Sequence, residues 1–71
     1  MGDETTGYEV REDVLDDGTP VFDVYRLTDG DSEYVETYYD EGTALRHARV
    51  AAAADGLEEC EIKVYRRETN G

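Results

Sequence analysis

Only one segment of this 71-residue sequence has the periodicity of an α-helix, and the other patterned stretches alternate like β-strands. The helical segment runs from residue 41 to residue 55. Asp40 precedes it as a predicted N-cap, because a carboxylate there accepts hydrogen bonds from the amides of the first turn. Gly56 follows it as a predicted stop, because glycine readily adopts the left-handed conformation that ends many helices. Small residues at helical spacing should form the side that packs on a sheet: Ala44, Leu45, Ala48, Ala51 and Ala52.

Four stretches have the alternation and the residue types of strands, namely residues 8–15, 21–27, 33–39 and 59–66. Asp-Gly turns separate the first three, which predicts an antiparallel meander. The helix then crosses one face, so the last strand should run parallel to the first and lie beside it. The predicted fold class is α+β: a four-stranded, mainly antiparallel sheet in a β-β-β-α-β sequence, with one helix packed on one face. Pairing of the last strand with another subunit is the alternative.

This pattern predicts a single domain over residues 8–67. The polar residues 1–7 are expected to be a disordered N-terminal segment, and residues 68–71 a polar tail. Cys60 is the single cysteine, which excludes an internal disulfide and favours a reducing compartment. The sequence has no pattern of a signal peptide and no apolar run long enough for a membrane span. We therefore expect a cytoplasmic protein that has no contact with a membrane.

The charge of the chain is strongly acidic, with 19 Asp and Glu against seven Lys and Arg and a formal net charge of −12. The acidic residues are spread along the whole sequence, and Lys63 is the only lysine. This composition resembles that of small acidic proteins of unknown function from haloarchaea, which stay soluble in concentrated KCl. The resemblance implies a halophilic protein, since concentrated salt screens the repulsion between carboxylates. An acidic protein that binds a basic partner or mimics nucleic acid is the alternative.

The sequence contains no motif of a known catalytic or metal site. It has no glycine-rich phosphate loop, no nucleophile elbow, no pair of histidines at ligand spacing and no Cys-x-x-Cys. His47 is expected on the helix surface, and Cys60 as a small buried residue of the last strand. We therefore expect a protein that is not an enzyme, with no catalytic residues, no cofactor and no metal.

The alternation of the strands predicts which side chains face the helix and which face away. The set expected to face the helix comprises Tyr8, Val10, Phe22, Val24, Val35, Thr37, Tyr39, Cys60, Ile62 and Val64. The uncovered side should then carry more aromatic area than scattered surface residues supply. Its predicted binding residues are Tyr25, Leu27, Tyr34, Tyr38 and Tyr65, next to Val21.

We interpret this tyrosine-bearing face as the interface of a non-enzymatic, self-associating module, which forms a homodimer or binds an unknown protein partner. The alternative is a monomer that uses the same face as a binding platform for a ligand, a protein or stacked nucleobases. A small enzyme is the least favoured interpretation.

The order of the elements, with Tyr39-Asp40 opening the helix, resembles the plant AP2-type and integrase arm-type DNA-binding domains. Those domains read DNA with arginines on the sheet, and the corresponding strands here contain Arg11 and Arg26. These arginines stand among many carboxylates, whereas binding to phosphates needs positive charge at the contact. The resemblance therefore implies a similar topology, and the charge argues against nucleic acid as a partner.

Overall fold

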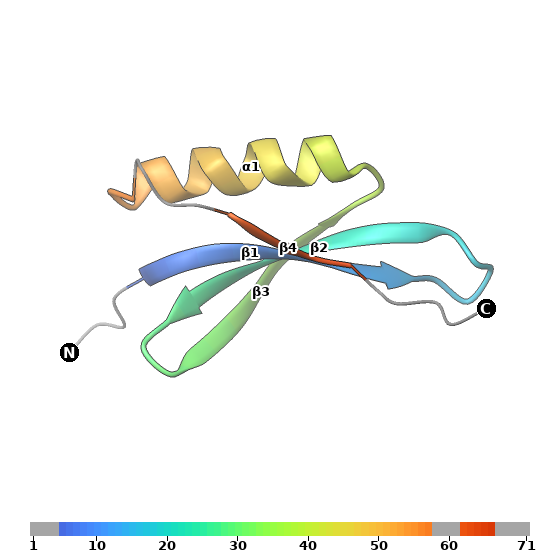
Figure 1. Cartoon of the computed structure of the whole chain (residues 1–71), viewed down its shortest axis with the longest axis horizontal. Coiled ribbons are helices and arrows are strands. Elements are labelled where there is room, and N and C mark those ends of the chain that lie inside the picture. The colour runs from blue at the N-terminus through green and yellow to red at the C-terminus, as the bar shows by residue number, and fades with distance from the viewer. Residues whose placement is uncertain (1–4, 58–61, 67–71) are drawn as a thin grey trace.

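The computed structural model describes residues 5–57 and 62–66. Its elements are β1 (Thr5–Val14), β2 (Pro20–Thr28), β3 (Asp31–Tyr38), α1 (Glu41–Ala54) and β4 (Lys63–Tyr65). The strands form one sheet in the order β3-β2-β1-β4, and α1 lies along one face of it (Figure 1). The pairs β1–β2 and β2–β3 are antiparallel, and β4 runs parallel to β1. The predicted fold class and strand order are confirmed.

Two strand boundaries differ from the prediction. β1 begins at Thr5, so residues 5–7 of the segment that we expected to be disordered belong to the sheet, where Thr5 pairs with Thr28. Among the described residues β4 spans Lys63–Tyr65, and Ile62 and Arg66 next to it are not part of the strand. Residues 59–61 of the predicted last strand, Cys60 included, lie outside the described residues, and so do residues 1–4 and the predicted tail.

Both ends of α1 have the predicted caps. Oδ2 of Asp40 accepts a 2.9 Å hydrogen bond from the amide of Thr43. At the other end Gly56 has a φ of +84°, and its amide donates to the carbonyl of Ala53. The amide of Leu57 donates to the carbonyl of Ala52 at 2.7 Å. This pair of hydrogen bonds satisfies the last carbonyls of the helix and turns the chain back toward the sheet.

The core lies between α1 and the face of the sheet that it covers. Alanine forms the whole fully buried part of the helix, which allows the helix backbone to approach the sheet closely. The buried core residues are Tyr8, Val10, Phe22, Val24, Ala44, Ala48 and Ala52. Partly buried residues pack around them: Tyr38, Leu45, Ala51, Leu57, Ile62 and Val64. The predicted side of the helix and the predicted facing of β1 and β2 are therefore confirmed.

The predicted facing of β3 is wrong for most of its residues. The pairing with β2 changes register between Val24 and Tyr25, where β3 has one extra residue. Tyr38 therefore lies opposite Phe22 on the helix side, and Thr37 lies opposite Asp23 on the other side. A β-bulge has this effect because one added residue moves all following side chains to the opposite face. Val35 and Tyr39, which we expected to face the helix, are 46% and 72% exposed.

Candidate functional site

The face of the sheet that points away from α1 is the candidate site, and we call it the open face (Figure 1). Its members alternate along each strand with the core residues, and strand register places them side by side. They are Gly7, Glu9, Arg11, Asp13, Val21, Asp23, Tyr25, Leu27, Ser32, Tyr34, Thr37, Lys63 and Tyr65.

A row of contacts crosses the open face from β1 to β3. The Nε of Arg11 donates a hydrogen bond to Oε2 of Glu9, which is buried. The guanidinium carbon of Arg11 lies 4.1 Å from the ring centroid of Tyr25. The ring of Tyr25 meets that of Tyr34 edge to face, with centroids 5.9 Å apart. Cation–π and edge-to-face contacts are both attractive, so these side chains hold one another in place.

A chain of hydrogen bonds fixes the outer end of this row. Oγ1 of Thr37 donates to Oδ1 of Asp23 at 2.6 Å. Because the Thr37 hydroxyl has a single proton, it accepts from the hydroxyl of Tyr34, which lies 2.6 Å away. The Tyr34 ring is thus tethered at its hydroxyl and still 55% exposed. Tyr65, on β4 at the opposite edge of the sheet, is 49% exposed.

Four of the five predicted binding residues share the open face: Tyr25, Leu27, Tyr34 and Tyr65. Tyr38 does not, because the bulge in β3 turns it toward α1. Its ring stacks on His47 with centroids 4.6 Å apart, and its hydroxyl donates to Glu36 at 2.9 Å. Partial burial and this hydrogen bond raise the pKa of Tyr38. His47 is on the exposed surface of the helix, as predicted.

Sequence reasoning left the polar members of the row out of the predicted binding residues. Glu9 and Arg11 alternate with Tyr8 and Val10, so the period-two pattern alone could have placed them on the open face. The link between Thr37 and Asp23 had no such signal, because it depends on the register after the bulge.

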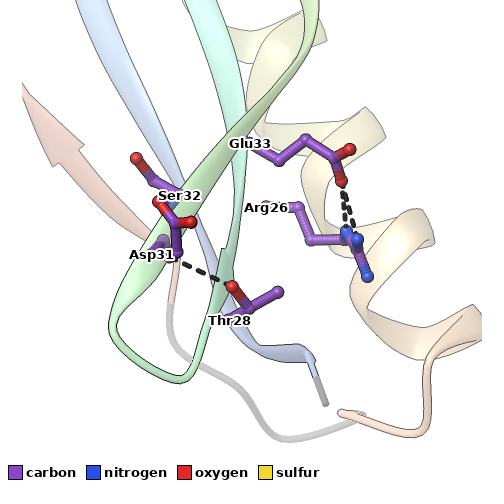
Figure 2. A pocket seen from close by; sticks show the side chains of 5 residues that line it. All are labelled: Arg26, Thr28, Asp31, Ser32 and Glu33. Carbon is purple, nitrogen blue, oxygen red and sulfur yellow. Dashed lines mark hydrogen bonds and ion pairs between the residues drawn. The ribbon is translucent and has the colours of Figure 1, made fainter. Parts of the chain in front are cut away.

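A shallow hollow of about 220 Å³ lies at the end of the β2–β3 hairpin. It is lined by Arg26, Thr28, Asp31, Ser32 and Glu33 (Figure 2). Figure 2 shows that Arg26 and Glu33 point to one side of the hairpin and Asp31 and Ser32 to the other. The guanidinium of Arg26 already binds Glu33 at 2.7 Å and Thr5 at 2.7 Å. Since the polar groups diverge and the cation is occupied, this hollow does not form a ligand site.

Within residues 5–57 and 62–66, His, Cys, Asp and Glu side chains do not form a group of three that could hold a metal ion. The helix of the described part is not long and apolar enough to cross a membrane. Comparisons with protein-family models, with curated proteins and with solved structures found no match for this chain.

Proposed function

We propose that this protein is a non-enzymatic interaction module that forms a homodimer through the open face. The proposal rests above all on the half-exposed rings of Tyr34 and Tyr65. They lie at the two ends of the row of side chains that contact one another across the open face. Tyrosine suits an interface because its ring buries apolar area while its hydroxyl keeps a polar partner. Side chains that are fixed before binding also lose less conformational entropy when the partner arrives.

The charge of the open face supports a second copy as the partner. The described part of this face carries the carboxylates of Glu9, Asp13 and Asp23, and that of Asp31 (Figure 2), against the two cations Arg11 and Lys63. It therefore has both signs of charge and only a small share of the net charge of −12 of the whole chain. In a two-fold dimer each contact is made twice, so a face with both signs of charge can complement itself.

The small core gives a physical reason for association. Of the seven residues in the buried core cluster, three are alanines, which contribute little apolar area. Domains of this size bury a small fraction of their surface and are marginally stable alone. A dimer would cover the tyrosine rings and add their burial to the stability of the fold.

The mass in solution tests this proposal directly. Sedimentation equilibrium in molar KCl should give twice the 8.0 kDa mass of one chain. The double variant Tyr34→Ser/Tyr65→Ser should sediment as a folded monomer, with an unchanged helical circular dichroism signal. Leu15→Ser is the matched control, because Leu15 is also an exposed apolar side chain but lies in the β1–β2 turn. This control should remain a dimer.

Two results would contradict the homodimer. A wild-type monomer at high protein concentration would mean that the open face binds a different partner or a ligand. A dimer that persists in the double variant would place the interface on another surface.

We also propose that the acidic composition adapts the protein to concentrated salt in the cytoplasm. The supporting observation is the spread of 19 acidic residues along the chain, with a single lysine. At molar salt the Debye length falls to about 3 Å, so repulsion between exposed carboxylates is largely removed. Under this proposal the charge reflects the solvent and not the partner.

A further inference from the structure

The outer surface of α1 differs in charge from the rest of the molecule. Asp and Glu supply 19 of the 71 residues, yet between Glu41 and Asp55 the sequence has none. The same segment contains Arg46 and Arg49, both exposed, and Val50, which is 64% exposed. The buried side of the helix consists of Ala44, Ala48 and Ala52. The two arginines and Val50 therefore lie on the side of the helix away from the sheet, and we call Arg46, Arg49 and Val50 the arginine stripe.

The arginines of the stripe differ from the other arginines that the structure describes. Arg11 is paired with Glu9, Arg26 with Glu33, and Arg66 with Glu41. Within the described part of the chain, neither Arg46 nor Arg49 forms an ion pair or a side-chain hydrogen bond. Arg46 and Arg49 therefore do not neutralise any carboxylate among the described residues, and their guanidinium groups can bind a second molecule.

We propose that the arginine stripe docks a carboxylate-rich segment of a partner protein. Residues three apart on a helix have Cβ atoms about 5 to 6 Å apart, so the two guanidinium groups can bind neighbouring carboxylates. Arginine binds a carboxylate through two parallel hydrogen bonds, which act at short range and tolerate salt better than long-range attraction does. Val50, four residues after Arg46, adds an apolar contact beside the charges. This surface lies opposite the open face, so the inference does not depend on the proposed dimer.

Protein is a better match than nucleic acid for this stripe. Binding to a polynucleotide requires that several phosphates be neutralised, and its strength rises with their number. Within the described residues the stripe offers two unpaired cations, which are enough to pair with two neighbouring carboxylates but too few to neutralise several phosphates. The exposed Val50 beside the charges also fits a side chain better than a phosphate backbone.

Fluorescence anisotropy with defined probes can test the assignment. The first probe is a fluorescein-labelled amphipathic peptide of about 20 residues built from Glu, Leu and Ala, long enough to form a helix. The second is the same peptide with Gln in place of Glu, and the third is a single-stranded oligonucleotide of about 20 nucleotides. The full-length protein should bind the Glu peptide at least about tenfold more tightly than either of the other probes.

Variants then assign the binding to the stripe. Arg46→Gln/Arg49→Gln should weaken binding of the Glu peptide about tenfold or more, and Val50→Ser by a few fold. Arg66→Gln is the control, because it also removes an exposed cation but one that is already paired with Glu41, and it should bind as the wild type does. All of these side chains are exposed, so the variants should keep the circular dichroism spectrum of the wild type.

Four results would overturn the proposal. They are the absence of binding to the Glu peptide at millimolar concentration, equal binding of the Glu and Gln peptides, an equal loss in Arg66→Gln, and tighter binding of the oligonucleotide. The last result would assign the stripe to nucleic acid. None of these results tests whether the open face forms a dimer, because the dimer is tested separately by the mass in solution.

Discussion

The hydroxyl of Tyr8 in β1 donates a 2.6 Å hydrogen bond to Oδ2 of Asp55, the residue that caps the C-terminus of α1. This contact joins the first strand to the end of the helix, 47 positions apart in the sequence. The ring of Tyr8 belongs to the core, while its hydroxyl reaches the edge where the helix ends. Burial of the phenol, followed by its hydrogen bond to Asp55, raises the pKa of Tyr8 to about 12.

This pKa makes the stability depend on pH in the alkaline range. The folded-state pKa of about 12 lies above the ordinary value of 10.0, so folding favours the neutral phenol. The resulting stabilisation is complete below pH 10 and is lost as the pH rises through 12. A shift of this size corresponds to roughly 3 kcal/mol. Urea unfolding of the wild type in molar KCl should show this loss between pH 10 and 12.

Tyr8→Phe isolates the contribution of the hydroxyl. At neutral pH the variant should be less stable by about 1 to 2 kcal/mol, because Asp55 loses its donor while the ring remains buried. The difference in the free energy of unfolding between the wild type and the variant should shrink toward zero between pH 10 and 12, because only the wild type has the Tyr8 hydroxyl to ionise. All other groups titrate in both proteins, so their effects cancel in the difference. A constant difference over this range would show that the Tyr8 hydroxyl does not control the alkaline transition.

The N-cap of α1 gives a second prediction. Oδ2 of Asp40 accepts from both the amide and the hydroxyl of Thr43, at 2.9 and 3.2 Å. Asp40→Ala removes this acceptor and should lower the free energy of unfolding by about 1 kcal/mol. Asp40→Asn keeps a side-chain oxygen and should retain most of the stability. Thermal unfolding followed by circular dichroism would measure both, and equal melting temperatures of Asp40→Ala and wild type would contradict the cap.

The bulge in β3 predicts that substitution of two neighbouring tyrosines changes the stability by very different amounts. Tyr38 stacks on His47 and packs against the core, whereas Tyr39 is 72% exposed. Tyr38→Ala should therefore lower the free energy of unfolding by about 2 kcal/mol or more, and Tyr39→Ala by less than about 0.5 kcal/mol. Urea unfolding of the two variants measures the difference. The reverse order would mean that β3 follows the uninterrupted alternation expected from the sequence.

The contrast between β3 and the other elements shows what the sequence could predict. The caps of α1 are local, because Asp40 and Gly56 act on neighbouring residues through the chemistry of their own side chain or backbone. The facing of Tyr8, Val10, Phe22 and Val24 follows from an alternation that matches the sheet without interruption. These features were predictable because each is determined within a few residues of sequence.

The facing of β3 could not be derived in this way. Between Tyr34 and Tyr38 the apolar and polar residues do not alternate cleanly. Either of the two alternating sets of side chains could therefore face the helix and be buried. The choice is made by pairing with β2, where the step from Val24 to Tyr25 accommodates the extra residue. The hydrogen bond of Thr37 to Asp23 and the stack of Tyr38 on His47 both depend on that choice. Part of the candidate site was therefore predictable, but its polar network was not.

The net charge of −12 predicts that salt stabilises this fold. Raising KCl from about 0.05 M to about 1 M shortens the Debye length from over 10 Å to about 3 Å, which screens the repulsion between exposed carboxylates. The ion pairs that the structure describes weaken as well. They are few and mostly at exposed side chains, so their loss is smaller than the gain from reduced repulsion.

The free energy of unfolding, measured by urea titration at each KCl concentration, should therefore rise with salt. Tetramethylammonium chloride is a suitable comparison, because it screens charge without the specific properties of K⁺ and should produce a similar rise. The open-face double variant Tyr34→Ser/Tyr65→Ser separates screening from assembly, since its monomer should keep a salt dependence while losing the dependence on protein concentration. A free energy of unfolding that is equal in dilute buffer and in molar KCl would contradict the halophilic interpretation of the charge.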